Sequence, residues 1–214
     1  VVRDIKLRYR RSFLGLLWSL LIPLSQAIVF IFLFKVVLHV HSSPHYMPFV
    51  FSGVLLWNWF QTSLFQATGA ITDNRELVRR PGFPVAVLPV VTIATNFIHF
   101  LLALPVLLLL FILDGDGARV SFIAVPFLLA VQFIFTVPFA YIVAALQVRY
   151  RDTAQVVGVA LMLGFYLTPV FYDLAAVPPR YSLLYEFNPM SHVTAGFRTA
   201  ILGGASLHIV PLVI

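Results

Sequence analysis

The sequence predicts an all-α integral membrane protein, and its composition and long apolar runs carry that prediction. Of its 214 residues, 61% are hydrophobic and 10% are charged, and the mean hydropathy is +0.98. An ordinary soluble domain is about 45–50% apolar and about 25% charged. A water-soluble fold of this size has no core large enough to bury so much apolar surface. The composition therefore excludes a soluble enzyme, a nucleic-acid-binding domain and a disordered tail.

Five apolar runs are long enough to span a bilayer, because a membrane-spanning helix needs roughly 20 residues. They cover residues 14–38, 49–71, 85–113, 120–148 and 156–171. The third and fourth are long enough to tilt, and the fifth is short, with Pro169 near its end. A sixth run begins near Leu207. Because the chain starts at Val1 and ends inside that run at Ile214, we expect it to be part of a longer protein.

The basic residues gather on one side of these predicted spans. Ten of the 14 lysines and arginines precede the first span or follow the second and the fourth, namely Arg3, Lys6, Arg8, Arg10, Arg11, Arg75, Arg79, Arg80, Arg149 and Arg151. The other four are Lys35, Arg119, Arg180 and Arg198. Because cytoplasmic loops carry an excess of Lys and Arg, this split predicts a cytoplasmic N-terminus. A sixth span would return the C-terminus to the same side.

The segment before the first span has the pattern of an interfacial helix. Apolar side chains recur every four positions from Val1 to Phe13, while Lys6 and Arg10 lie on another face. A helix with one apolar and one basic face lies in the plane of the membrane surface. Residues 1–12 are therefore predicted to lie at the inner interface.

The loop after the second span, residues 73–84, differs from an ordinary polar loop. Its helix-like part, residues 74–80, carries charges of both signs, and a rigid Pro81-Gly82-Phe83-Pro84 turn follows. Local stiffness is what a docking element for a cytosolic motor subunit would need, since a push must be transmitted and not absorbed. The alternative, an ordinary charged loop, stays open.

The outer connections are of two kinds. Residues 114–119, DGDGAR, have the composition of a short turn. Residues 173–206 form a long outer segment in which Pro178-Pro179 precede an amphipathic stretch, residues 188–202. That stretch is too polar to span the bilayer and apolar enough to lie in the interface or to dip into it.

The sequence contains few residues suited to catalysis or metal binding. It has no cysteine, which excludes disulfides and thiol chemistry, and no G-x-x-x-x-G-K-[ST] loop to hold ATP phosphates. No carboxylate lies deep in a span, which argues against a proton- or sodium-driven carrier. His39, His41 and His45 lie close together near the outer end of the first span. They are interpreted as interfacial histidines, with a metal site as the less favoured alternative.

Neutral hydrogen-bonding side chains recur within the apolar spans. They are Gln26, Asn58, Gln61, Gln66, Asn96, His99, Gln132 and Gln147. One interpretation is that they join helix to helix, at about 0.6 kcal/mol for each such contact. The other is that they line a lumen suited to an uncharged polyhydroxyl cargo.

Aromatic side chains make up 15% of the chain and gather in the predicted outer half. Examples lie in the second span, at the end of the fifth and just beyond it: Trp57, Trp59, Phe60, Tyr166, Phe171 and Tyr172. An aromatic belt at the headgroup level would explain them. Stacking against the apolar C–H face of sugar rings would explain them equally.

The basic residues of the first segment also allow two interpretations. Attraction to anionic lipid is worth about 1 kcal/mol per charge near the surface. A more specific interpretation is recognition of a pyrophosphate headgroup, for which clustered arginine is well shaped.

Several motifs, in this order, resemble those of a known family. They are RDIKLRYRRSFLGLLWSLLIPL at residues 3–24, GVLLWNWF at 53–60, NRELVRRPGFP at 74–84, RYRD at 149–152 and FNPMSHVTAGFR at 187–198. Together they resemble the permeases of type-2 ABC transporters, and within these the polysaccharide-export group that carries O-antigen, capsule or teichoic acid. The resemblance covers almost the whole chain.

The resemblance implies a fold and a set of partners. Residues 1–214 would be one transmembrane permease domain of six helices, with the interface helix at 1–12 and the last span truncated. Two copies would form the channel in the cytoplasmic (inner) membrane, and two copies of a separate ATP-binding subunit would hold ATP and Mg²⁺. The cargo would be a glycan on an undecaprenyl-pyrophosphate carrier. The chain itself would be a transporter without cofactor, catalytic residue or bound nucleic acid.

The resemblance also implies roles for particular residues. The ATPase-coupling loop, residues 73–84, would use Arg75, Glu76, Arg79, Arg80 and Phe83. The lipid-pyrophosphate headgroup would meet Arg3, Lys6, Arg8, Arg10 and Arg11. The channel would be lined by Trp57, Trp59, Phe60, Gln61, Tyr166, Phe171 and Tyr172. The outer gate, residues 173–206, would include Asn188, Pro189 and Arg198.

Three alternatives follow from the residues themselves. The same architecture could export a drug or a lipid. A membrane enzyme acting on polyprenyl-phosphate sugars would need acidic residues near one face, and Asp4, Asp73, Glu76 and Asp152 are predicted there, each within basic sequence that favours ion pairing. A passive scaffold for glycan assembly would not depend on an ATP-binding partner.

Overall fold

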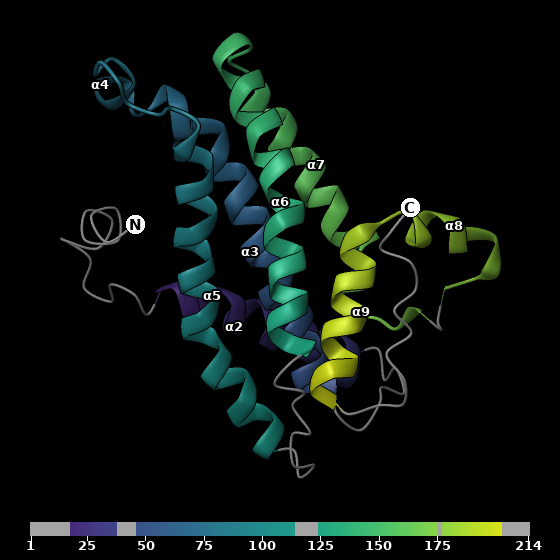
Figure 1. The fold of residues 1–214 in the computed structure, drawn as a ribbon. Coiled ribbons are helices and arrows are strands. Elements are labelled where there is room, and N and C mark those ends of the chain that lie inside the picture. The colour runs from purple at the N-terminus through teal and green to yellow at the C-terminus, as the bar shows by residue number, and fades with distance from the viewer. Residues whose placement is uncertain (1–17, 38–45, 114–123, 175–176, 203–214) are drawn as a thin grey trace.

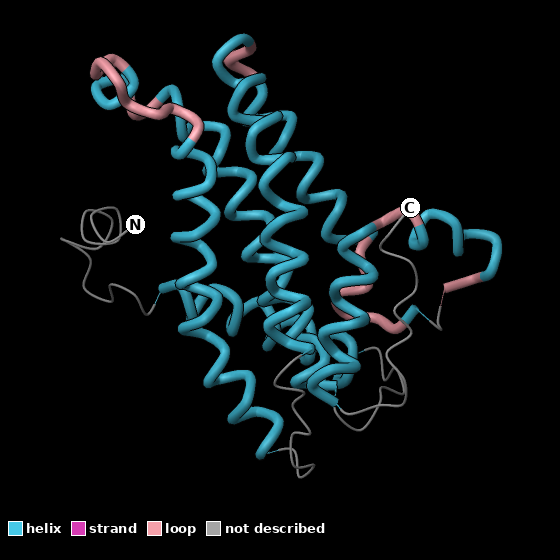
Figure 2. Tube along the Cα trace, viewed as in Figure 1, coloured by secondary structure: helices cyan, strands magenta, loops and turns pink. Residues whose placement is uncertain are grey.

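The computed structural model describes residues 18–37, 46–113, 124–174 and 177–202 (Figure 1). Every regular element within these ranges is helical, which confirms the predicted all-α class (Figure 2). The predicted interface helix, the turn at residues 114–119, the three clustered histidines and the start of a sixth span lie outside the described residues.

The long helices follow the predicted spans. The π-helix η2 continues α2, and α3 and α5 each have 27 residues, against 26 in α6 and 15 in α7. Their bounds are α2 Trp18–Ile31, η2 Phe32–Val37, α3 Tyr46–Thr72, α5 Val87–Leu113, α6 Ala124–Arg149 and α7 Thr153–Leu167. Five of the predicted apolar runs are therefore helical within the described part of the chain.

Helices α5 and α6 are long and apolar enough to cross a membrane. At about 1.5 Å per residue each measures roughly 40 Å, more than a hydrocarbon core of about 30 Å. Each buries one face in the bundle and leaves large apolar side chains exposed on the other, such as Leu109 and Ile134. Exposed apolar faces of this kind suit a lipid surrounding.

Helix α7 is shorter than the predicted fifth span and ends before Pro169. Its C-cap, Thr168, has φ −101° and ψ 140°, an extended conformation. Proline disfavours the helical conformation in the residue that precedes it, so the helix stops there. At about 1.5 Å per residue, α7 reaches roughly 22 Å and does not span a bilayer by itself.

Helix α3 is the centre of the bundle. It packs most extensively against α5 and α6, and α2, α7 and α9 also lie against it. Buried small residues on α3, among them Ser52, Ser63, Ala67 and Ala70, let neighbouring backbones approach. The side chains around α3 therefore form the core of the bundle.

Two connections lie together at one end of the bundle. The short helix α4, Arg75–Val78, and the turn between α6 and α7 both lie at the top of Figure 1. The sequence places the basic loops after the second and fourth spans on one side, and the structure brings them to one end. Which side of the membrane that end faces stays a prediction.

The outer segment folds back onto the bundle. It contains the 3₁₀ turn η4 Pro179–Tyr181, then α8 Ser182–Glu186 and α9 Pro189–Leu202. Helix α9 packs on α6 and α3 through an apolar face that includes Met190, Val193 and Phe197. The stretch predicted to lie in or dip into the interface is thus a packed part of the bundle.

Candidate functional site

The polar loop, residues 73–84, is a compact folded element. Helix α4 is tied back to α3, because Asn74 Nδ2 donates to the carbonyl of Ala70 at 2.9 Å. The Nε of Arg75 donates to the carbonyl of Thr72 at 3.2 Å. These bonds fix the direction in which the loop leaves the bundle.

The loop then reverses at Pro81-Gly82. Gly82 has φ 76°, and the N–H of Phe83 donates to the carbonyl of Arg80 at 3.2 Å. Proline followed by a residue of positive φ is the pattern of a type II turn, in which glycine is strongly favoured. The stiffness expected of the Pro-Gly-Phe-Pro sequence therefore has a defined geometry.

The residues predicted to contact an ATPase share this loop. Arg75, Glu76, Arg79 and Arg80 are exposed, whereas Phe83 is half-buried. Close to the far end of the loop, Tyr141 Oη on α6 donates to the carbonyl of Ala86 at 2.6 Å. A stiff charged projection, anchored on both sides, could dock a cytosolic subunit, and that role stays a prediction.

A continuous row of aromatic rings, here called the aromatic row, runs from α6 through α3 to α7 and on to α8. Its neighbours have centroid distances between 4.9 and 6.3 Å, for example Phe30 stacked on Phe171 at 4.9 Å and Trp57 against Phe165 at 6.0 Å. Distances of about 4.5–7 Å are those of interacting aromatic pairs. The members are Phe30, Trp57, Phe60, Phe135, Phe139, Phe165, Tyr166, Phe171, Tyr172 and Tyr185.

Trp59 belongs to a different aromatic group. Its ring lies 4.8 Å from that of Phe97 and 5.3 Å from that of Phe100, both on α5, and its Nε1 donates to the carbonyl of Ile93 at 3.4 Å. Residues two apart on an α-helix point about 200° apart. The structure therefore separates Trp59 from Trp57, and Trp59 has the environment of a packing residue.

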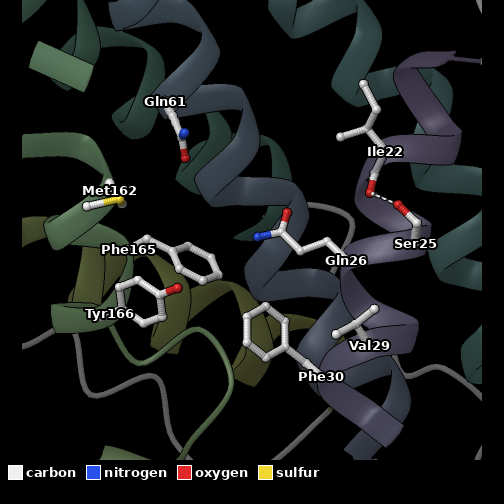
Figure 3. Close-up of a pocket in the computed structure, with 9 residues that line it drawn as sticks. All are labelled: Ile22, Ser25, Gln26, Val29, Phe30, Gln61, Met162, Phe165 and Tyr166. Carbon is white, nitrogen blue, oxygen red and sulfur yellow. Dashed lines mark hydrogen bonds between the residues drawn. The ribbon is translucent and has the colours of Figure 1, made fainter. Parts of the chain in front are cut away.

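One cavity, here called the Gln61 cavity, opens between α2, α3 and α7 with a volume of about 470 Å³. Its amide side chains come from α2 and α3 and its rings from α2 and α7 (Figure 3). The lining includes Ser25, Gln26, Phe30, Gln61, Phe165 and Tyr166. The size falls in the range of small-molecule sites, about 300–1,000 Å³.

A second cavity, here called the outer cavity, has a volume of about 460 Å³. It lies between α3, α6, α7 and the outer segment, and Trp57 and Phe60 line it together with Tyr185, Phe187 and Asn188. The aromatic row therefore borders both cavities. Of the residues predicted to line a channel, Trp57, Phe60, Gln61 and Tyr166 lie at one cavity or the other.

Asn188 ties the outer segment to the end of α7. Its Nδ2 donates to Thr168 Oγ1 at 3.0 Å, and its Oδ1 accepts from the N–H of Met190 at 3.0 Å. The second bond is an N-cap of α9, and Pro189 occupies the first helical position, where a missing N–H costs nothing. The predicted gate residues Asn188 and Pro189 thus begin α9 at the edge of the outer cavity.

Arg198 is a buried cation at the opposite part of α9. Its side chain is 7% exposed, and its guanidinium lies 3.5 Å from the centroid of the Phe49 ring. Nη1 donates to the carbonyl of Pro169 at 2.7 Å. Nη2 donates to the carbonyls of Val170 at 2.6 Å and Phe49 at 3.1 Å. One side chain therefore joins α9, the chain after α7 and the start of α3.

Two further aromatic residues join the outer segment to α7. Tyr172 Oη donates to the carbonyl of Tyr166 at 3.1 Å and lies 2.9 Å from Tyr185 Oη on α8. Burial, and then the hydrogen bond with Tyr185, raise the pKa of Tyr172 above its ordinary value. The Tyr172 hydroxyl is therefore uncharged at neutral pH.

Several of the neutral polar residues join helix to helix. Asn96 Nδ2 donates to Gln66 Oε1 at 3.1 Å between α5 and α3, and Gln132 Nε2 donates to the carbonyl of Leu56 at 2.9 Å. Gln147 Oε1 accepts from the N–H of Ala154 at 2.8 Å across the α6–α7 turn. Only Gln26 and Gln61 of the predicted set line the Gln61 cavity. Gln26 both contacts α3 through Asn58 and lines this cavity, so the two roles overlap in one residue, and the lining of a lumen stays a prediction.

Some predicted site residues lie outside the described part of the chain, and others were missed. The headgroup residues Arg3, Lys6, Arg8, Arg10 and Arg11 belong to the first group. Sequence reasoning missed Phe30, Phe49 and Phe165, and also Gly53, which lies against Arg198, because their importance depends on contacts made across the fold. Arg198 is a charged residue within an apolar helical stretch, and this pattern indicates that buried acceptors surround its side chain.

A bundle of long apolar helices, with an aromatic row beside two cavities and a charged loop at one end, is compatible with a membrane transport subunit. Comparison with known proteins agrees. Residues 1–202 match the ABC-2 type transporter family, and the chain belongs to that family.

Named relatives agree with the family. The chain is 36% identical over 200 residues to the O-antigen export system permease protein RfbA of Myxococcus xanthus, covering 92% of this chain and 76% of the relative. It is 30% identical over 203 residues to the RfbA permease of Klebsiella pneumoniae, covering 94% and 78%. The polysialic acid transport protein KpsM of Escherichia coli is 20% identical over 205 residues, covering 95% and 80%. The family expected from the sequence motifs is confirmed.

Proposed function

We propose that this chain is the transmembrane permease of an ATP-driven exporter that moves a polysaccharide across the cytoplasmic membrane. The observation that carries the proposal is the match of 92% of the chain, at 36% identity, to an O-antigen export permease. The aromatic row supports it, as do two cavities whose described lining residues carry no charge, because a pyranose ring has an apolar C–H face and neutral hydroxyl groups.

We propose further that a separate ATP-binding subunit supplies the energy and holds ATP and Mg²⁺. These 214 residues contain no phosphate-binding G-x-x-x-x-G-K-[ST] sequence. The loop of residues 73–84 supports a docking role, because its turn is stiff and its charged side chains are exposed. In this proposal Arg75, Glu76, Arg79, Arg80 and Phe83 contact the subunit.

The working form would be a homodimer with its N-termini in the cytoplasm. Large apolar side chains are exposed along α2 and α7 beside the cavities, for example Val29, Val159 and Leu163. A second copy would cover part of this surface, and lipid would cover the rest. The glycan would travel on a lipid pyrophosphate, with Arg3, Lys6, Arg8, Arg10 and Arg11 near its headgroup and residues 173–206 at the exit.

The experiment removes the gene from the native bacterium and restores it on a plasmid. Surface polysaccharide is measured by immunoblot and glycan analysis, and the tagged permease is purified from its membranes for mass spectrometry. Loss of surface polysaccharide, its restoration and a stoichiometric ATP-binding partner would support the proposal. Unchanged surface glycan, accompanied by altered drug resistance or lipid content, would show that the proposed polysaccharide cargo is wrong. An intact permease without an ATP-binding partner would overturn the proposed energy source.

A further inference from the structure

The Gln61 cavity has polar groups whose hydrogen-bonding sense is fixed by the surrounding protein. The indole N–H of Trp57 donates to Gln61 Oε1 at 2.7 Å. Because an indole nitrogen can only donate, the oxygen of Gln61 must face it, and the –NH₂ group is the end that stays available. This orientation follows from the chemistry of the partner.

Gln26 repeats the arrangement from the neighbouring helix. Its Oε1 accepts from Asn58 Nδ2 at 3.3 Å. In Figure 3 its amide nitrogen points across the cavity toward the Phe165 ring. Among the described residues neither Gln26 Nε2 nor Gln61 Nε2 meets an acceptor. The cavity therefore offers two amide donors that await acceptor oxygens.

The rest of the lining sets the class of ligand. Phe30 and Phe165, 5.6 Å apart between centroids, and Tyr166, 5.4 Å from Phe165, provide ring surfaces around the donors. Among the described residues that line this cavity, none is charged. Burying an anionic group without a cationic partner costs several kcal/mol or more. The lining thus combines ring faces, amide donors and electrical neutrality.

We propose that the Gln61 cavity is a specificity-determining saccharide subsite, in which Gln61 and Gln26 donate hydrogen bonds to an uncharged sugar residue held against Phe165 and Tyr166. The inference rests on the proposed function. It adds that the part of the cargo bound in the Gln61 cavity is uncharged. A sugar residue supplies acceptor oxygens to the amides and a C–H face to the rings. A lipid tail would leave both donors unpaired, and an anionic sugar would leave its charge uncompensated.

The test uses the permease with its ATP-binding partner in lipid nanodiscs. Saturation-transfer NMR reports contact with two probes, the neutral disaccharide di-N-acetylchitobiose and the anionic disialic acid. We expect transfer to the neutral probe and little to the anionic one. Equal or stronger transfer to disialic acid overturns the proposal, as does an absence of transfer to either.

Variants show whether the binding uses this cavity. Gln61→Glu keeps an oxygen for Trp57 and removes the donor, whereas Gln61→Leu removes both. Gln155→Glu and Gln155→Leu make the same changes at an exposed position of α7 outside the cavity. Each position-61 variant should weaken binding of the neutral probe by about 3- to 10-fold, as expected for one lost hydrogen bond. The position-155 variants should leave it unchanged.

Several outcomes would contradict the subsite. If the position-61 and position-155 variants bind the neutral probe alike while remaining assembled with the ATP-binding subunit, the donors are not used. If Gln61→Leu binds the neutral probe more tightly, the sugar is held by apolar contact and the Gln61 amide does not donate to it. The proposed function is judged separately by restoration of surface polysaccharide, so an exporter that works without this binding would overturn the subsite alone.

Discussion

Gly53 on α3 lies directly against the guanidinium of Arg198 on α9. A Cβ added at Gly53 would come within 2.6 Å of Arg198 Nη2 and 2.7 Å of the Val170 carbonyl oxygen. Two residues 145 positions apart in the chain therefore depend on each other, because the missing side chain of one makes room for the hydrogen bonds of the other. This contact joins the outer segment to the central helix.

Gly53→Ala should displace Arg198 and loosen the outer segment. Overpacking a filled site costs about 1–3 kcal/mol. We expect a lower unfolding temperature of the purified permease and faster proteolysis within residues 168–202. Gly158→Ala is the matched control, because a Cβ there meets only the Phe65 ring at 3.6 Å, an ordinary contact. Equal stability of the two variants would contradict the role assigned to Gly53.

Arg198→Leu should be more damaging than Gly53→Ala. It removes the donors to the carbonyls of Phe49, Pro169 and Val170 and leaves them without that partner. Each unsatisfied buried group costs about 1–3 kcal/mol. We expect reduced permease level in the membrane, with Arg180→Leu, at an exposed arginine of the outer segment, as the control. Normal level and export in Arg198→Leu would show that the three bonds contribute little.

The positions of the helices could be predicted from the sequence, but the contacts between them could not. The runs at residues 85–113 and 120–148 became α5 and α6 almost unchanged, because roughly 20 apolar residues suffice to specify a span. The amphipathic stretch predicted at residues 188–202 is helix α9, and the structure adds that Asn188 caps it. These helix positions could be predicted because they depend on residues that are close together in the sequence.

The candidate site was less accessible to sequence reasoning. Trp57 and Trp59 were grouped because they are close in sequence, yet one belongs to the aromatic row and the other packs on α5. Residues two apart on an α-helix point in nearly opposite directions, so helix geometry alone predicts that the two tryptophans have different neighbours. The neighbours of Arg198 cannot be predicted in this way, because only the folded chain brings Pro169 and Val170 to it.

The double variant Arg79→Glu with Arg80→Glu should weaken association with the ATP-binding subunit while leaving the permease folded. Both side chains are exposed on the loop of residues 73–84, so reversing their charge breaks no packing. We expect at least tenfold less partner in a pull-down, which corresponds to about 1.4 kcal/mol. Arg180→Glu in the outer segment controls for the reversal of an exposed arginine away from the loop. An undiminished partner would show that this loop is not the docking surface.

Tyr172→Ala and Trp59→Ala should separate transport from packing. Tyr172 lies in the aromatic row and bonds Tyr166 and Tyr185, so its loss should slow export more than it lowers the amount of protein. Trp59 is 3% exposed in the α3–α5 core, and truncating a buried tryptophan costs about 3–5 kcal/mol. Its variant should therefore lose protein and export in parallel. Surface polysaccharide per permease, measured by glycan immunoblot normalised to membrane permease, distinguishes the two. If the ratio falls equally in both variants, the aromatic row has no special part in transport; if it is unchanged in Tyr172→Ala, that residue serves the fold alone.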